Sequence, residues 1–189
     1  MAKENLKTTK YNDGTAIPLI TNDGQWIHAT TDGYCWYQHN EAAYREVYGA
    51  LYNWFAINTG KLCPKGWHVP SEIEWITMET YLGMNAAEAK ELGWRGVDKG
   101  IGGMLKSTTG EWTQPNTGAS NSSGFTGLPG GTRTMNGNFD YINNYGYWWC
   151  AVQKDDDFGN MRSVSWELTT VFKSLYPKTY GMSVRCIMD

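Results

Sequence analysis

The sequence has few of the features that mark membrane-spanning, DNA-binding or zinc-binding proteins. No apolar stretch approaches the roughly 20 residues that cross a bilayer. The 16 lysines and arginines are spread along the 189 residues and the net charge is -3, so nucleic acid is not an expected partner. The chain has 3 histidines and no closely spaced cysteine pair, which disfavours a zinc site of the usual spacing.

The first residues lack the charged region and the apolar stretch of an export signal. We therefore expect any such signal to be absent from this sequence. The length is that of one sizeable domain, and we expect a single domain over 1–189.

Aromatic residues are abundant, with 10 tryptophans and 12 tyrosines against 5 phenylalanines. Trp and Tyr combine a large contact area with a polar group, so they suit an irregular core and also a surface that binds a partner. The composition permits either role.

The chain has four cysteines, Cys35, Cys63, Cys150 and Cys186. Four cysteines allow three complete pairings, and the residues alone do not select one. Buried free thiols are the alternative, because cysteine packs well as a small apolar residue.

Helical patterns are confined to the first half of the chain. Apolar residues at helical spacing predict a first helix over about 42–60. A second helix is predicted over 71–83, where the Ser71 hydroxyl and the Glu74 carboxylate form a capping box. A short helix is predicted over 85–93 by the same capping logic.

Turns, loops and strands account for the rest. Two Asp-Gly steps within 11–24 predict turns between short strands. Residues 100–137 are rich in Gly, Ser, Thr and Asn with regular aromatic anchors, which is typical of a long ordered loop region. Strands are predicted over 145–152, 161–168 and 180–188. Helices followed by an antiparallel sheet predict an α+β fold.

Several motifs along nearly the whole chain point to one family. They are YGALYNW at 48–54, LCPKGWHVP at 62–70, PNTGA at 115–119, GF at 124–125, LPGG at 128–131 with Arg133, YGYWW at 145–149 and GMSVRC at 181–186. This combination resembles the Fibrobacter succinogenes major paralogous domain, a family of exported bacterial proteins. The resemblance implies a C-type-lectin-like fold, with two main helices packed on small antiparallel sheets and long ordered loops.

The resemblance also implies which cysteines pair. In C-type lectins a cysteine after the first helix is bonded to one in the last strand, and Cys63 and Cys186 match these positions. A disulfide between them is therefore implied, with Cys35 and Cys150 unpaired. Formylglycine-generating enzymes share the fold and use a cysteine pair in the C-terminal half, where Cys150 is the only cysteine besides Cys186, so a redox pair is missing. Nucleophilic catalysis would need Cys150 to meet His68, which we expect to be structural.

Three further segments carry groups that suit an ion or a sugar, and each also has a plain structural interpretation. Gln-Pro-Asn at 114–116 resembles the calcium-binding and sugar-binding triplet of lectins, or is a loop. Three aspartates at 155–157 offer carboxylates, or form a solvated turn. Residues 128–133 lack the end of a P-loop and are interpreted as a strand with a tight bend. We assign no metal ligand and no cofactor; calcium is kept as an alternative.

The tract 158–177 departs from the family. Its frame is kept at Arg162, Val164, Val171 and Lys178, whereas mixed side chains stand where Asn is usual. This pattern resembles the variable protein of a diversity-generating retroelement, in which a lectin-like scaffold carries a programmed variable surface. Drift in an exposed loop is the alternative.

Strand alternation divides this tract into two faces. Over 161–167 it places Arg162, Val164 and Trp166 on a supporting face, and it places the alternate residues on an exposed face: Met161, Ser163, Ser165 and Glu167. The candidate ligand-binding residues are Trp149, Phe158, Met161, Ser163, Ser165, Glu167, Leu168, Thr170, Phe172, Ser174, Leu175 and Tyr176. Exposed together, the apolar members Met161, Phe172, Leu175 and Tyr176 would form a patch of the kind that marks an interface.

These patterns favour a non-catalytic ligand-binding or adhesive module, displayed on a cell surface or appendage, with its binding face over 158–177. The expected partner is a protein or a glycan on another cell or surface. Two alternatives stay open. One is a calcium-dependent carbohydrate-binding domain that uses 110–123 and Trp149, and the other is an oxidase related to the formylglycine-generating enzymes.

Overall fold

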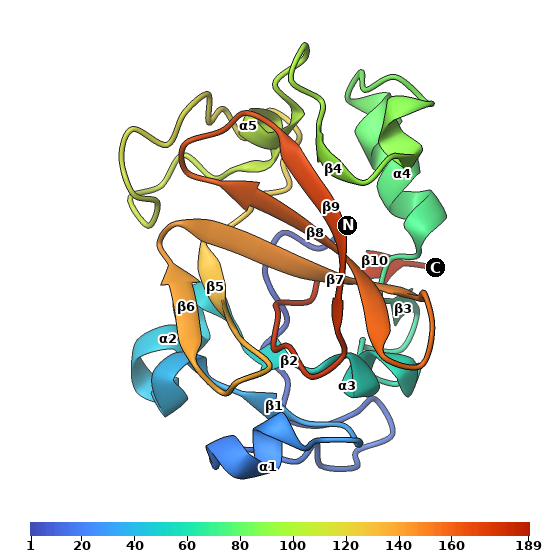
Figure 1. Cartoon of the computed structure of the whole chain (residues 1–189), viewed down its shortest axis with the longest axis vertical. Helices are drawn as coiled ribbons and strands as arrows, with labels where there is room; N and C mark the ends of the chain where they lie inside the picture. The colour runs from blue at the N-terminus through green and yellow to red at the C-terminus, as the bar shows by residue number, and fades with distance from the viewer.

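Few helices and several small antiparallel sheets make up the α+β fold of the computed structural model, which describes all 189 residues (Figure 1). The helices are α1 (Asp23–Ile27), α2 (Glu41–Tyr48), α3 (Trp54–Asn58), α4 (Glu72–Tyr81) and α5 (Ile101–Leu105), with 3-10 turns η1 (Tyr37–His39) and η2 (Glu88–Lys90). The strands are β1 (Tyr34–Cys35), β2 (Leu51–Tyr52), β3 (Trp67–His68), β4 (Gly93–Arg95), β5 (Gly130–Arg133), β6 (Phe139–Ile142), β7 (Tyr145–Gln153), β8 (Phe158–Ser165), β9 (Val171–Pro177) and β10 (Ile187–Met188).

The central sheet has four antiparallel strands in the order β4-β9-β8-β7. The other strands form two-stranded sheets, β1-β2, β3-β10 and β5-β6. The first residues of the chain run beside the last ones (Figure 1), and the Ala2 amide donates to the Cys186 carbonyl at 2.8 Å.

A hydrophobic core lies against each face of the central sheet, because neighbouring residues of a strand point to opposite sides. Trp148 and Val164 belong to one core together with Trp75 of α4. Trp149 and Met161 belong to the other core. Both faces of β7 and β8 therefore pack against protein, and α4 covers only one of them.

Helix α4 begins at a capping box, which confirms the prediction from the sequence. The Glu74 amide donates to the Ser71 hydroxyl at 3.3 Å, and the Ser71 amide donates to the Glu74 carboxylate at 2.8 Å. The two hydrogen bonds satisfy backbone donors that a helix start leaves without partners.

The single helix predicted over 42–60 is wrong, because α2 and α3 are separate helices with β2 between them. Gly49 leaves the helical path with a φ of 76°, a conformation that glycine adopts without a steric penalty. A Cβ there would lie 2.7 Å from the Leu6 carbonyl oxygen. Asn53 then starts α3 by accepting from the Ala56 amide.

A predicted turn and a predicted short helix also need correction. Residues 21–24 contain the start of α1 in place of a turn between strands, because the Asn22 side chain caps a helix by accepting from the Gln25 amide. The helix predicted over 85–93 is only the turn η2. The region 100–137 is mostly ordered loop, as predicted, and it also contains α5 and β5.

The strands of the second half are partly predicted. β7 begins where the sequence places it, whereas β8 covers 158–165 in place of 161–168, and β9 lies where no strand is predicted. The strand predicted over 180–188 is reduced to β10. The reason is that the chain before β10 makes single bridges to three different partners, at Gly181, Met182 and Ser183, so it never forms a continuous ladder.

A buried network of charged side chains joins α4 to the central sheet. Glu79 accepts from Arg162 at 2.8 Å and from Arg95 at 2.9 Å. Glu72 accepts from Arg162 at 3.1 Å and pairs with Lys173 at 2.6 Å. Burial alone would raise the pKa of Glu72, but the hydrogen bonds and charges of Arg162 and Lys173 hold it below its usual value. Glu72 therefore stays ionised at neutral pH.

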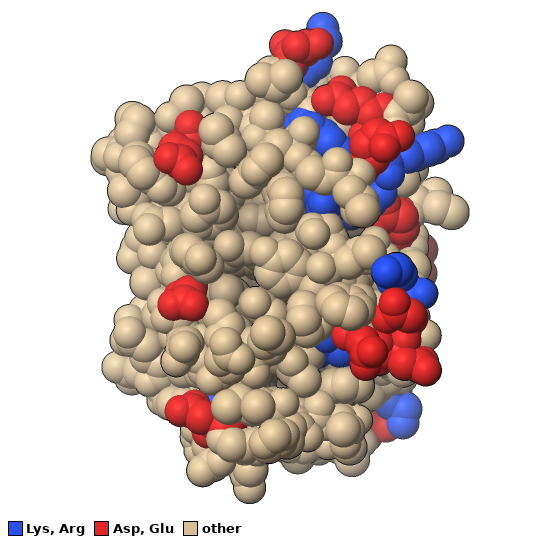
Figure 2. Space-filling view, viewed as in Figure 1, with Lys and Arg blue, Asp and Glu red and all other residues tan.

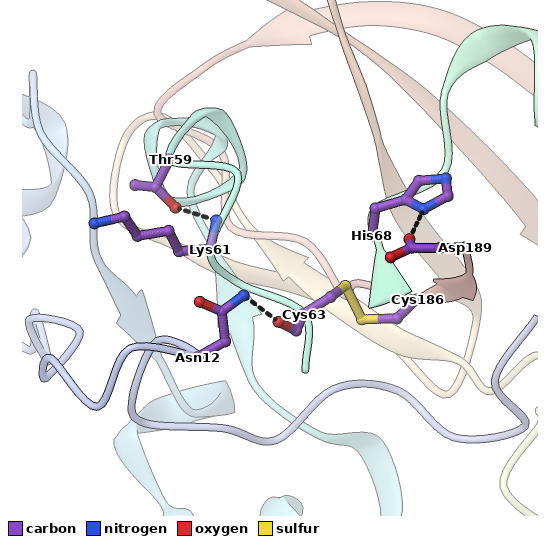
Figure 3. The surroundings of a disulfide bond; sticks show 7 residues. All are labelled: Asn12, Thr59, Lys61, Cys63, His68, Cys186 and Asp189. Carbon is purple, nitrogen blue, oxygen red and sulfur yellow. Dashed lines mark hydrogen bonds and ion pairs between the residues drawn. A yellow bond between two sulfur atoms is a disulfide. The ribbon is translucent and has the colours of Figure 1, made fainter. Parts of the chain in front are cut away.

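The disulfide implied by the family resemblance is present. Cys63, between α3 and β3, is bonded to Cys186, just before β10 (Figure 3). The bond joins the middle of the chain to its end across a sequence separation of 123. Cys35 and Cys150 are buried and free, as predicted.

Replacing Cys63 and Cys186 by serine should lower the free energy of unfolding by about 5 kcal/mol, the chain-entropy value for a closed loop of this length. Denaturant unfolding of the double variant measures the loss. Cys35→Ala is the control, because it removes a cysteine without opening a loop. A double variant as stable as this control would contradict the role given to the disulfide.

Candidate ligand-binding site

An aromatic hollow of about 230 Å³ lies on the face of the central sheet that α4 does not cover. It is defined by its seven lining residues, six of which are aromatic. They are Trp94, Tyr141, Tyr145, Tyr147, Ser163, Phe172 and Tyr176. The lining comes from β4, β6, β7, β8 and β9, so the hollow exists only in the folded chain.

Strand pairing builds the floor of the hollow. Tyr147 of β7 pairs with Ser163 of β8, Ser163 pairs with Phe172 of β9, and Phe172 pairs with Trp94 of β4. Residues directly opposite each other in paired strands point to the same face. A single row of side chains therefore crosses all four strands of the sheet.

Neighbouring rings contact one another along the hollow. The ring centroids of Trp94 and Phe172 are 4.7 Å apart, and those of Tyr141 and Tyr145 are 5.2 Å apart. Tyr145 and Tyr147 are stacked at 5.7 Å. These are attractive geometries for aromatic pairs. The rim is accessible, since Trp94 is 43% exposed and Tyr141 is 51% exposed.

The floor holds a polar group that has no partner. Ser163 is 1% exposed and its hydroxyl makes no hydrogen bond within the protein. Ser165, two residues along the same face of β8, also has a buried hydroxyl without a partner. An unsatisfied buried hydroxyl costs about 1–3 kcal/mol. A ligand group that reaches the Ser163 hydroxyl can satisfy it.

Charge is divided unequally between the two faces of the sheet. The basic residues Arg95, Arg162 and Lys173 lie on the α4 side and are paired with Glu72 and Glu79. None of the lining residues of the hollow is charged. Figure 2 shows a broad uncharged area over the middle of the face in view, with charged side chains gathered toward its edges.

The hydroxyls of Tyr147 and Tyr176 stay protonated at neutral pH. Burial, and then the neighbouring Tyr176 and Tyr141, raise the pKa of Tyr147 far above its usual value. Burial and Tyr180 likewise raise the pKa of Tyr176. The hollow thus offers neutral hydroxyl groups and aromatic faces to a ligand.

Three of the candidate residues taken from the sequence line the hollow: Ser163, Phe172 and Tyr176. Five others are exposed or half-buried outside its lining, and their role stays a prediction. They are Phe158, Glu167, Leu168, Ser174 and Leu175.

The predicted exposure of five candidates, Trp149, Met161, Ser163, Ser165 and Thr170, is wrong, because all five are buried. Both faces of β8 pack against a core, so strand alternation does not separate an exposed side from a buried one. Trp149 donates its indole N–H to the Tyr52 carbonyl at 2.8 Å inside the core. It is therefore not a platform for a sugar ring.

The predicted apolar patch also needs correction. Phe172 and Tyr176 point to the hollow. Leu175 is the direct neighbour of Tyr176 in the same strand, so it points to the opposite face. Met161 is 0% exposed. The four residues therefore do not form one surface.

Sequence reasoning missed the four remaining aromatic residues of the lining, Trp94, Tyr141, Tyr145 and Tyr147. The spacing of Tyr145, Tyr147 and Trp149 places these residues on one face of a strand, and this signal was available. Trp94 and Tyr141 lie in segments without a strand pattern, so only the fold brings them to the hollow.

Cys150 is not placed as a nucleophile. Burial, and then the charge of Glu72, raise the pKa of its thiol to about 12, whereas reactive cysteines have a lowered pKa. Its sulfur contacts the Glu72 carboxylate at 3.8 Å. Cys186 is held in the disulfide and forms no redox pair with it.

The loop with Gln114 and Asn116 is held by the protein itself. The Asn116 amide group donates to the Ser107 carbonyl at 3.0 Å. No group of three or more His, Cys, Asp or Glu side chains is placed to hold a metal ion. Asp155 accepts from the amides of Asp157 and Phe158, which makes 155–157 part of a turn.

Lys106 fills the space between this loop and β8. Its ammonium group donates to the carbonyl oxygens of Thr117, Ser165 and Leu168 at 2.8, 2.9 and 3.0 Å. Burial lowers the pKa of Lys106 to about 8. A cation of the chain itself thus takes up a cluster of oxygen atoms at the end of β8.

A larger cavity of about 510 Å³ lies between α3 and α4 beside the disulfide. Its polar side chains bond to one another: Glu74 accepts from the Ser71 hydroxyl at 2.7 Å and lies 2.7 Å from His68. Because these groups are satisfied within the protein, the aromatic hollow is the better candidate for a binding site.

His68 pairs with two acidic side chains, and this pairing introduces a pH dependence. Its ring lies 2.6 Å from Asp189 (Figure 3) and 2.7 Å from Glu74. The hydrogen bond to Asp189, followed by that to Glu74, raises the pKa of His68 above 6.5. A raised pKa in the folded state stabilises the protein below the unfolded pKa, and this stabilisation is lost as the pH rises through the folded value.

The variant His68→Gln should therefore be less stable than the wild type at about pH 5 and should approach it at about pH 9. The difference should stay under about 1 kcal/mol, because both pairs are partly exposed to solvent. Urea unfolding at the two pH values measures it. A stability difference that does not change with pH would contradict the ion-pair role of His68.

None of the helices of the chain is long and apolar enough to cross a bilayer.

Comparison with known proteins identifies the family of the chain. No curated protein and no solved structure matched the chain. The model of the Fibrobacter succinogenes major domain matches residues 1–188. The chain therefore belongs to the Fibrobacter succinogenes major domain family.

Proposed function

We propose that this chain is a non-catalytic ligand-binding or adhesive module displayed outside the cell, and that the aromatic hollow is its contact surface. The observation that carries the proposal is the row of Tyr147, Ser163, Phe172 and Trp94, with an unsatisfied hydroxyl in its middle. Clustered aromatic rings with a few polar groups are the composition of ligand pockets and of interface centres.

The proposal includes a C-type-lectin-like architecture. It is supported by helix α4 packed on the central sheet, by the long ordered region 100–137 and by the first and last residues lying side by side. The Cys63 to Cys186 disulfide supports a location outside the cell, because disulfides persist in oxidising compartments. The protonated, buried thiol of Cys150 supports a role without catalysis.

The proposal keeps the programmed variable surface, but confines it to one face of the sheet. Phe172, Ser174 and Tyr176 are alternate residues of β9 and point to the side of the hollow. Changes at these positions would alter the contact surface while leaving Arg162 and Lys173 in the ion network on the other side. The frame and the variable positions are therefore separable in this fold.

A screen of the whole chain against a random-peptide display library and a glycan array tests the proposal. Bound ligands should lose about tenfold or more in affinity with Tyr176→Ala and with Trp94→Ala, as expected for aromatic residues at the centre of an interface. The matched control is Tyr81→Ala, an aromatic residue that is 89% exposed and lies outside the hollow.

Binding should also survive a chelator, which separates this module from a calcium-dependent lectin. Circular dichroism melting checks that each variant is folded. Ligands whose affinity is unchanged by both hollow variants would reject the aromatic hollow as the binding site.

A further inference from the structure

We propose that the aromatic hollow receives a cationic side chain, arginine or lysine, presented by a protein partner. This inference rests on the proposed function and specifies the ligand chemistry of the same site. The hollow has a volume of about 230 Å³, which is below the ~300–1,000 Å³ of pockets that enclose a whole drug-sized ligand. The hollow therefore suits one side chain of a partner that covers the surrounding surface.

The aromatic faces supply the attraction. The face of a Trp, Tyr or Phe ring carries partial negative charge and attracts a cation within about 6 Å of its centroid. Tyr145 and Tyr147 are nearly parallel, with 20° between their planes, and Trp94 leads from the rim to Phe172 on the floor. Six of the seven lining residues are aromatic, so a cation that enters the hollow lies beside several rings.

Elsewhere in the molecule, basic side chains of the chain itself lie against aromatic rings. Arg133 lies 4.4 Å from the ring of Trp26, Arg185 lies 4.5 Å from Phe125, and Lys178 lies 4.7 Å from Trp54. None of the eight cation–ring contacts of the chain uses a ring of the hollow. The richest cluster of aromatic faces is thus the one without an internal cation.

The charges around the hollow favour a positive ligand. The basic residues of the sheet are paired on the other face, and no lining residue is basic. Glu167 lies close enough to Tyr145, and Asp140 close enough to Tyr180, to add to the effect of burial in raising the pKa of these hydroxyls. Tyr145 lines the hollow and the ring of Tyr180 lies 4.9 Å from that of Tyr176, so both carboxylates lie near the hollow and would attract a positive ligand.

The polar groups fit an N–H donor. The Ser163 hydroxyl is buried in the floor and has no partner within the protein. Hydroxyl oxygens accept hydrogen bonds, and a guanidinium group carries five N–H donors on a planar frame that also stacks on aromatic rings. A guanidinium group that reaches the floor of the hollow would therefore satisfy the Ser163 hydroxyl.

Titration of the whole chain with acetyl-arginine amide, followed by the NMR signals of the Trp94 indole and of the hollow tyrosines, tests the inference. Acetyl-citrulline amide is the matched probe, because it has nearly the same shape and no charge. Acetyl-arginine amide should shift these signals saturably and bind at least about fivefold more tightly than the citrulline probe, the gain expected for desolvated cation–π contacts.

Variants locate the interaction. Trp94→Leu should remove most of the preference for arginine, Trp94→Phe should keep it, and Tyr81→Leu should leave it unchanged, because Tyr81 lies outside the hollow. Glu167→Gln should weaken arginine binding without changing citrulline binding. Trp94 is 43% exposed, so its variants are expected to fold, which circular dichroism verifies.

The outcomes separate the two proposals. Equal affinity of the two probes for the hollow would overturn the cation inference and leave the proposed function standing. Peptides or glycans from the screen that bind in the hollow while neither probe shifts its signals would have the same meaning. Ligands that bind only elsewhere, with no probe in the hollow, would overturn both.

Discussion

The fold depends on a buried ion network between α4 and the central sheet. Arg162 connects Glu72 and Glu79 of the helix, and Glu79 also holds Arg95 of β4. Arg162 and Glu79 are 1% and 0% exposed, so neither charge is solvated by water. Removing one partner of such a buried pair typically costs about 3–5 kcal/mol, because the other charge is left without compensation. The helix and three strands are therefore held in one arrangement.

The same network explains why the opposite face can serve a ligand. Strand alternation sends every basic residue of β8 and β9 toward α4, and it leaves only uncharged residues on the other side of these strands. Helix α4, the ion network and the disulfide hold the strands of the central sheet in place. The hollow is therefore formed before a ligand arrives. A preformed site avoids the free energy of ordering side chains upon binding.

The sequence predicts what depends on local pattern. The capping box of α4, the start of β7 and, through the family resemblance, the disulfide are all confirmed. The break at Gly49 and the burial of Met161 were missed, because both depend on packing against distant parts of the chain. Strand alternation is a local pattern, and it identified Ser163 as part of the site. Trp94 enters the site only through the pairing of β4 with β9, which a local pattern does not show.

Hydrogen exchange of the variant Glu79→Gln tests most directly whether one ion network holds the helix and the sheet together. The account predicts that the amides of α4, β8 and β9 lose protection together, because the neutral amide leaves Arg95 and Arg162 without their shared carboxylate. Loss of protection confined to α4, with β8 and β9 as protected as in the wild type, would contradict it.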